Sequence, residues 1–416
     1  MDSYIPNFFK VNVTFLKHGA VWSPKDKTQR SYKVYKMYQV IVLFLTLGCS
    51  SYSVVMGIII HLKNFAILIE VLSVSFTILL AAVKTSFWLI KGEKIKIIMN
   101  RLETDLFHCE KIDDFDPEGM LNQAKLSGIK YACLLLFFSH LVLGLGYIPV
   151  MSLACWYYFK DLQITDVPTF KTLPYYTHIP FDHDTPLKYI FACLLQCVPM
   201  YLYVNAFVGV DSLFMNLMNF IATRMLILQG AFRTMRKRCL QKIIGYDLAP
   251  DSLHNSNEME EYMMSDMKKC IQHLQLLLRS CKDIEDNFQY VSLVQALGTI
   301  YILCSTLLLL STSPPFTKEF GRNIFYLLGV IVQLGLYCWF GNQLTLKAAN
   351  VPIAVWESQW LETRKPFKIC MLLTMMRMKR PLLINAGKFV PLILDTQIAV
   401  LKGSYSYYTV LKGMSK

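Results

Sequence analysis

The sequence has few charged residues and none of the motifs of the common enzyme classes. Asp, Glu, Lys and Arg make up 17% of its 416 residues, against about 25% in a typical soluble domain. No GxSxG, HExxH, P-loop or dinucleotide-binding motif is present, and the eight histidines are scattered along the chain. We therefore expect no enzymatic activity, no catalytic residue and no cofactor.

Paired metal-binding cysteines are also missing. The twelve cysteines include no CxxC pair, which gives little support to a zinc or thioredoxin-like site. Three loops between apolar runs lack cysteine altogether: 61–64, 160–186 and 312–323. No disulfide can therefore join these loops. Two histidines and two aspartates in the loop 160–186 match no standard metal motif, so we expect no metal ion there.

Long apolar runs dominate the chain instead. Hydrophobic residues make up 54% of the sequence, and about 20 consecutive apolar residues are enough to cross a bilayer as a helix. Seven runs qualify: Tyr38–Ile60, Phe65–Ile90, Ile129–Phe159, Leu187–Ala222, Phe288–Ser311, Ile324–Leu346 and Leu382–Leu411. We therefore predict an all-α membrane protein with seven transmembrane helices, and no signal peptide before the first of them.

The basic residues are distributed unevenly between the two sides that these spans define. The net charge of +13 suggests nucleic acid at first, but 30 of the 42 Lys and Arg residues lie before the first span or in the even-numbered loops. Only eight lie in the odd-numbered loops or after Leu401. Positive residues favour the cytoplasmic side. We therefore predict a cytoplasmic N-terminus, an extracellular C-terminus and no nucleic-acid partner.

The seven predicted spans and the side assigned to each loop divide the chain into segments of one membrane domain, 1–416. Residues 38–222 hold spans one to four, 288–346 hold spans five and six, and 382–411 hold span seven. The cytoplasmic segments are predicted to be 1–37, 223–287 and 347–381. No Gly- or Ser-rich linker and no internal repeat interrupts the chain.

Two cytoplasmic regions are apolar enough to need a packing surface. Residues 258–288 repeat apolar side chains every three or four positions, as an amphipathic helix does, and we expect that helix to continue into span five. Its apolar face either covers the chain's own core or contacts another subunit. Residues 348–381 interleave tryptophan and leucine with charge and are interrupted by Pro352 and Pro366. Together the two regions predict a cytoplasmic layer of helices that anchors the spans.

Ionisable residues inside membrane spans are costly and usually face protein or water. For Lys84, near the end of span two, we expect an interfacial position in which the side chain reaches the headgroups. Span seven differs, because Asp395 and Lys402 lie two turns apart on one face, close to small and hydroxylated residues. That sector either packs tightly against another helix or lines water.

Three blocks near the C-terminus carry a family resemblance. They are YCWFGNQLT at 337–345, KRPLLINAGKF at 379–389 and LKGSYSYYTVLK at 401–412. In sequence, order and spacing they resemble the signature of the insect odorant receptor family. The alternative is a seven-helix G-protein-coupled chemoreceptor, but those receptors keep the N-terminus outside. The chain also lacks their acid-Arg-aromatic signature after span three.

The resemblance implies an odorant-tuning subunit of a ligand-gated, non-selective cation channel. Such a subunit assembles with a common co-receptor, as a hetero-oligomer that we expect to be a tetramer, in the plasma membrane of a sensory dendrite. Four copies of span seven surround the pore, and the odorant binds in the outer half of the bundle. The co-receptor itself carries a longer segment between spans four and five than 223–287, so we predict a tuning subunit.

The predicted topology and the family resemblance together predict residues for the ligand-binding site and for the pore. The ligand-binding candidates lie in the outer halves of spans two, three, four and six: Ile69, Ser73, Phe76, Tyr147, Met151, Met200, Tyr201, Phe325 and Tyr326. The pore and gate candidates lie on span seven: Thr396, Ala399, Gly403, Ser406, Thr409 and Val410. Val410 matches the hydrophobic constriction of the family. The proline-rich loop 160–186 is a candidate lid over the ligand cavity.

Overall fold

A computed structural model describes residues 8–22, 30–63, 65–104, 107–162, 164, 167, 170, 173–175, 178–244 and 257–414. The helices are α1 (Lys10–His18), α2 (Arg30–Leu43), the π-helix η1 (Phe44–Cys49), α3 (Ser50–His61), α4 (Phe65–Glu103), α5 (Pro117–Phe159), α6 (Pro186–Arg233), α7 (Met235–Ile244), α8 (Asn257–Thr312), α9 (Lys318–Ala349), α10 (Val351–Trp356), α11 (Lys365–Met378) and α12 (Leu394–Met414). A short antiparallel hairpin of β1 (Asn385–Ala386) and β2 (Val390–Pro391) precedes α12.

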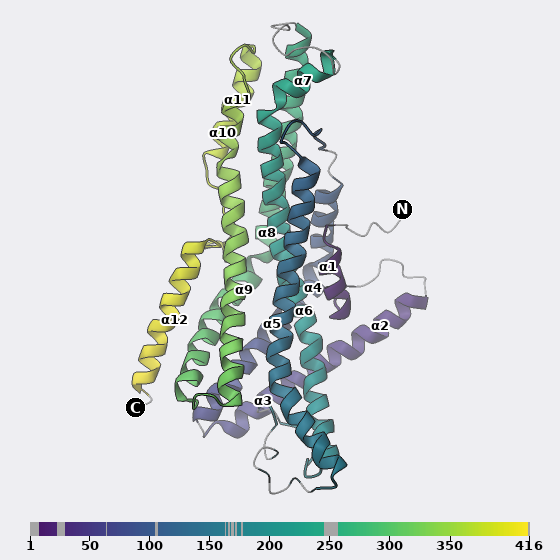
Figure 1. The fold of residues 1–416 in the computed structure, drawn as a ribbon, viewed down its shortest axis with the longest axis vertical. Helices are drawn as coiled ribbons and strands as arrows, with labels where there is room; N and C mark the ends of the chain where they lie inside the picture. Colours follow the sequence, from purple (N-terminus) through teal and green to yellow (C-terminus); the bar gives the residue numbers. More distant parts are fainter. Residues whose placement is uncertain are drawn as a thin grey trace.

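Five long helices form the body of the molecule. α4, α5, α6, α8 and α9 run along its long axis and pack against one another (Figure 1). At one end, uppermost in Figure 1, lie α7, α10 and α11, and we call it the α7 end. At the opposite end lie the connections from α3 to α4, from α5 to α6 and from α8 to α9, and we call it the loop end.

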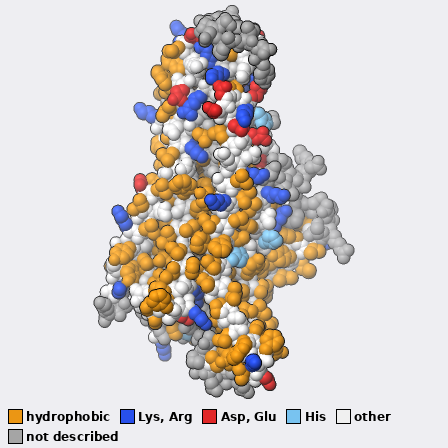
Figure 2. Space-filling model, in the orientation of Figure 1, with side chains coloured by type: hydrophobic (Ala, Val, Ile, Leu, Met, Phe, Trp, Pro, Cys, Tyr) orange, Lys and Arg blue, Asp and Glu red, His pale blue; other side chains and the backbone are white. Residues whose placement is uncertain are grey.

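Six helical segments are long and apolar enough to cross a membrane within the described residues: Tyr32–His61, Ile67–Glu103, Pro117–Phe159, Pro186–Arg233, Glu258–Thr312 and Lys318–Trp356. They coincide with the first six predicted spans, which confirms those helices. Hydrophobic side chains cover the middle and lower parts of the face in Figure 2, whereas charged side chains gather toward the α7 end. This separation is typical of a body in lipid with one end in water.

Local signals in the sequence set where these helices begin. Asp116 caps α5 by accepting a hydrogen bond from the backbone N–H of Gly119 at 3.1 Å, and Pro117 follows at the first helical position. Thr185 and Thr317 cap α6 and α9 in the same way. Side-chain oxygens at these positions satisfy backbone N–H groups that have no partner inside the helix. The two threonine caps fix helix ends beside the loop 160–186.

α8 confirms that the amphipathic region after residue 257 continues into the fifth span as one helix. Its apolar side chains are directed into the chain's own core. Seven apolar positions make up the repeat, and five of them are at most 5% exposed: Met263, Met267, Leu274, Cys281 and Ile284. The other two, Ile271 and Leu278, are half-buried. Of the two alternatives for this face, the structure therefore favours cover for the chain's own core over a contact with another subunit.

The seventh predicted span is shorter than the sequence suggested. The apolar run begins at Leu382, but the helix begins only at Leu394, because residues 384–392 form the β hairpin. Gly387 and Lys388 have positive φ angles of 61° and 68°, which favour glycine and end a helix or strand. The orientation of α12 in a membrane stays a prediction.

Candidate functional site

A cavity of about 170 Å³ lies inside the bundle toward the loop end. Helices α4, α5, α6, α8 and α9 all contribute to its wall, together with Tyr175 from the loop 160–186. Apolar side chains supply most of the lining, among them Leu80, Leu135, Phe138, Phe207, Ile302 and Val330. Arg322 and Gln333 both line it and lie three turns apart on α9, which separates them by roughly 16 Å along the helix axis.

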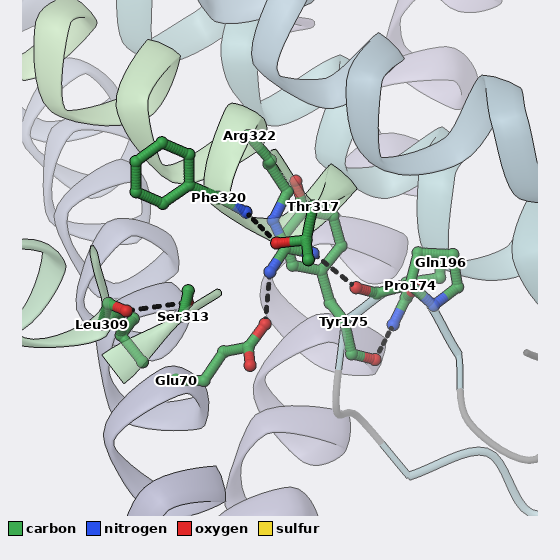
Figure 3. Close-up of polar contacts among 9 residues, drawn as sticks. All are labelled: Glu70, Pro174, Tyr175, Gln196, Leu309, Ser313, Thr317, Phe320 and Arg322. Atoms are coloured by element: carbon green, nitrogen blue, oxygen red, sulfur yellow. Dashed lines mark hydrogen bonds and ion pairs between the residues drawn. The ribbon is translucent and has the colours of Figure 1, made fainter. Parts of the chain in front are cut away.

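An ion pair lines the end of the cavity nearest the loops. Arg322 on α9 forms an ion pair with Glu70 on α4 and donates a hydrogen bond to the carbonyl oxygen of Pro174 at 3.0 Å (Figure 3). Its guanidinium also lies 5.2 Å from the centre of the Tyr175 ring. Gln196 on α6 donates to the carbonyl oxygen of Tyr175 at 2.8 Å. Pro174 and Tyr175 are thus held beside the cavity by α9 and α6. Whether the loop 160–186 acts as a lid stays a prediction.

Hydroxyl groups line the middle of the wall. Tyr326 on α9 is hydrogen-bonded through its hydroxyl to Thr77 Oγ1 on α4. Thr77 Oγ1 also donates to the carbonyl oxygen of Ser73, one turn away, at 3.2 Å. All three residues line the cavity. Such a group can orient a ligand oxygen within an otherwise apolar space.

A buried ion pair lies at the deep end of the cavity. Lys84 Nζ lies 2.6 Å from Asp211 Oδ1, and each side chain is 1% exposed. Gln333 Nε2 donates to Asp211 Oδ2, and the Tyr337 hydroxyl donates to Oδ1 at 2.7 Å. The Lys84 ammonium also lies 3.4 Å from the centre of the Phe207 ring. The expectation that Lys84 occupies the membrane interface was therefore wrong.

Three of the nine nominated ligand-binding residues line the cavity: Ser73, Met200 and Tyr326. Tyr147 lies behind that wall, donating its hydroxyl hydrogen to Met200 Sδ at 3.3 Å. Phe76 packs on Tyr301, with ring centres 4.0 Å apart. The other four also fall outside the lining, Ile69 and Met151 half-buried, Tyr201 and Phe325 exposed. Contact of any of the nine with a ligand stays a prediction.

Sequence reasoning missed the charged and amide groups of the cavity. Glu70 and Arg322 lie close to predicted span ends, where single charges are ordinary. Lys84 and Asp211 carried a usable signal, since two opposite charges within different spans tend to pair with one another. Gln295 on α8 had no such signal in the sequence, because span five was not expected to contribute to the cavity.

One apolar cluster connects the cavity wall to α12. Leu80, Ile302 and Val330 line the cavity and are buried together with Leu303. Val400 and Leu401 of α12 pack against the same cluster. One turn on, the Cys304 thiol on α8 donates to the carbonyl oxygen of Ser404 at 3.2 Å. The cavity wall and α12 therefore share one packed apolar cluster.

The nominated pore residues lie on α12, which packs on α8 and α9. Ala399, Ser406, Thr409 and Val410 are exposed in the single chain, and Thr396 and Gly403 are half-buried. Ser404, on the opposite side, is 1% exposed. Asp395 and Lys402 are also exposed, and no ion pair joins them within the described residues. Whether the exposed face borders a pore stays a prediction.

The cysteines and the glycosylation motif at Asn12 can now be placed. All twelve cysteines are free thiols. Asn12, in the motif Asn-Val-Thr, is fully buried on α1. Its side-chain amide forms hydrogen bonds with the side chains of Ser212 and Asn216 on α6, each at 2.8 Å. The folded chain therefore leaves no room for a glycan on Asn12.

Comparison with known proteins gives a consistent result. The family model described as 7tm Odorant receptor matches residues 64–405. Odorant receptor Or1 of Anopheles gambiae is 20% identical over 426 aligned positions, which cover 98% of this chain and 95% of that protein. Odorant receptor Or2 of the same mosquito is 24% identical over 152 residues, so the chain spans only 39% of that relative. Odorant receptor 23a of Drosophila melanogaster is 29% identical over 38% of its length.

The fold has a solved counterpart. The insect olfactory receptor OR5 from Machilis hrabei, determined in complex with eugenol, superposes with a TM-score of 0.76 over 98% of both chains at 15% sequence identity. Its structure without eugenol gives a TM-score of 0.75. The family model covers well over half of the chain and agrees with the C-terminal signature. This chain therefore belongs to the insect odorant receptor family of seven-helix olfactory membrane proteins.

Proposed function

We propose that the chain is the odorant-tuning subunit of a ligand-gated, non-selective cation channel. The observation that carries this proposal is the apolar cluster shared by the wall of the cavity and α12. It gives a ligand in the cavity a direct mechanical route to the helix that we expect beside the pore. A G-protein-coupled chemoreceptor, the other seven-helix candidate, is not favoured by the family to which the chain belongs.

The size and lining of the cavity support a small volatile ligand. An apolar protein cavity of about 150 Å³ is known to bind benzene, and this one is about 170 Å³. Most of its lining surface is apolar, as is usual where shape and a small number of hydrogen bonds determine the choice of ligand. OR5 holds eugenol, a small substituted phenol, in a chain of the same fold.

The charge distribution supports a cytoplasmic α7 end and an extracellular loop end. The basic segments 223–287 and 347–381 supply α7, α10 and α11, whereas the loops with few Lys and Arg residues lie at the other end of the bundle. With positive residues inside, the C-terminal part of α12 faces out. We place the protein in the plasma membrane of a sensory dendrite, as the family implies.

An exposed apolar surface supports assembly with other subunits. On α10 and α11 and between them, seven large apolar side chains are each more than half exposed: Ile353, Trp356, Leu361, Ile369, Leu372, Leu373 and Met376. Apolar patches of this kind mark interaction sites. We propose that this surface joins the chain to co-receptor subunits in a heterotetramer.

Within that assembly, α12 is proposed to form the chain's part of the pore. Its exposed side presents Ala399, Ser406 and Thr409, which are small or hydroxylated, and Val410 near its outer end. A ring of side chains like Val410 can close a pore by excluding water. A ligand opens the channel only if it binds the open form more tightly than the closed one. The apolar cluster is where we expect that difference in affinity to arise.

Current recording tests this function. In cells that express the chain together with a co-receptor, we expect odorant-evoked cation current that persists under G-protein blockade. Tyr326→Ala is expected to change odorant potency about tenfold, because Tyr326 lines the cavity. Phe325→Ala is the matched control, since its side chain is 37% exposed and does not line the cavity. Loss of all current under blockade would contradict the channel, and equal effects of the two variants would contradict the cavity.

A further inference from the structure

One buried hydrogen-bond acceptor in the cavity wall has no partner among the described residues. Gln295 on α8 lines the cavity and is 6% exposed. Its Nε2 donates to Thr299 Oγ1 at 3.0 Å, but its carbonyl oxygen Oε1 accepts no hydrogen bond from any described group. A buried acceptor left without a donor destabilises the protein. An occupant of the cavity that can donate a hydrogen bond removes this cost.

Gln295 lies at the deep end of the cavity. Gly298 packs directly on Leu80, since a Cβ at Gly298 would lie 2.9 Å from Leu80 Cδ1. The two helices run in opposite directions, so Gln295, one turn from Gly298, lies level with Lys84, one turn beyond Leu80. Lys84 pairs with Asp211, which also lines the cavity. Gln295 therefore lies at the same end of the cavity as the buried carboxylate.

The polar groups at that end are arranged to accept rather than to donate. Gln333 Nε2 and the Tyr337 hydroxyl both donate to Asp211, so these hydrogen bonds are directed at the carboxylate. Lys84 neutralises the same carboxylate from behind the wall. A cationic ligand would gain little from a carboxylate that already has its counter-ion. A neutral ligand with a hydroxyl group finds the carbonyl of Gln295 and lone pairs of Asp211.

We infer that Gln295 selects odorants that donate a hydrogen bond. The class is neutral alcohols and phenols whose apolar part fills the cavity and whose hydroxyl donates to Gln295 Oε1. Aldehydes, ketones and esters of the same carbon skeleton lack that proton and leave the acceptor unpaired. This inference rests on the proposed function, because the readout is odorant-gated current.

Matched odorant pairs test the inference. Benzyl alcohol with benzaldehyde, 1-hexanol with hexanal, and 1-octanol with octanal are applied to the chain co-expressed with a co-receptor. In the unmodified protein we expect alcohols to activate at about tenfold lower concentration than their aldehydes, a difference of about 1.4 kcal/mol. Gln295→Leu keeps a side chain of similar size without the acceptor and is expected to reduce the alcohol-to-aldehyde potency ratio to within about threefold.

Two further variants distinguish a loss of selectivity for alcohols from a general loss of folding or channel function. Gln295→Met repeats the removal of the acceptor with a flexible side chain, so a folding defect of one variant does not decide the result. Ile302→Ala, two turns on along α8, changes the cavity wall without touching a polar group and is expected to shift both members of a pair equally.

The outcomes are distinct. Potency that is equal for alcohols and aldehydes in the unmodified protein, or a ratio unchanged by both Gln295 variants, would overturn the inference while leaving the channel intact. The absence of current with every volatile would instead contradict the proposed function. Activation by aldehydes alone would also overturn the assignment of Gln295, because groups at the deep end would then donate a hydrogen bond to the odorant rather than accept one.

Discussion

Replacement of Asp211 by asparagine is expected to remove most of the folded protein from the cell surface. The substitution leaves the Lys84 ammonium at 1% exposure with no negative charge beside it. Removing one member of a buried ion pair typically costs about 3–5 kcal/mol, a large part of the roughly 5–15 kcal/mol that stabilises a typical protein. Thermal unfolding of the detergent-purified protein and surface labelling of cells both measure the loss.

A double variant identifies the cause of that loss. Lys84→Met combined with Asp211→Asn removes both charges while keeping an acceptor for Gln333 and Tyr337. We expect it to recover most of the stability lost in either single variant. The control is Asp283→Asn, the same chemical change in the Arg101–Asp283 pair, whose side chains are 39% and 41% exposed. Exposed pairs contribute less than about 1 kcal/mol. Single variants as stable as the control would contradict the buried pair.

Gly341→Val is expected to reduce odorant-evoked current at least tenfold. Gly341 lies on α9 within the block YCWFGNQLT, and a Cβ there would lie 2.1 Å from the carbonyl oxygen of Leu392. Such an approach is far below van der Waals contact, and the obstacle is backbone, which cannot rotate away. A side chain therefore pushes the hairpin and the start of α12 away from α9.

Hydrogen bonds to α8 and α9 hold the hairpin and the residues before it. The backbone N–H of Gly387 donates to the carbonyl oxygen of Gln289 on α8 at 2.9 Å. Thr345 on α9 donates to the carbonyl oxygen of Leu382 at 2.9 Å. Displacement at Leu392 therefore strains contacts with two helices and misplaces α12. This close contact also explains physically why the block contains glycine at this position.

Gly321→Ala provides the control for Gly341. It lies on the same helix, and nothing lies within 4 Å of a Cβ built at that position. Alanine also favours a helix by about 1 kcal/mol over glycine. We expect current, normalised to surface expression, to stay within about twofold of the unmodified protein. Normal current from Gly341→Val would contradict the proposed seating of α12 against α9.

Hydropathy was sufficient to predict the six confirmed spans, because lipid demands long uninterrupted apolar helices whatever their neighbours. It was misleading at residues 382–393, where the residues are apolar but form a hairpin and its turn. The turn signal was present in the sequence Asn-Ala-Gly-Lys at 385–388, which supplies the two positive φ angles. In that segment, local backbone preference decided the structure over apolar character.

The cavity could be predicted only in part. The position of a residue along a span gives its depth, so Ser73 and Tyr326 were found from topology. Rotation about the helix axis depends on how the helices pack, and the neighbours Phe325 and Tyr326 therefore have different surroundings. The contribution of α8 could not be foreseen, because it depends on the contact between Gly298 and Leu80 across two helices.

The central claim is that α12 ends outside the cell beside the conduction path, and sided modification of Val410→Cys tests it most directly. In the channel co-expressed with a co-receptor, a membrane-impermeant methanethiosulfonate reagent applied from outside is predicted to change the odorant-evoked current within seconds. The unmodified chain, with its twelve native cysteines, supplies the baseline. Modification of Val410→Cys only from the cytosolic side, or no change in current from either side, would contradict the account.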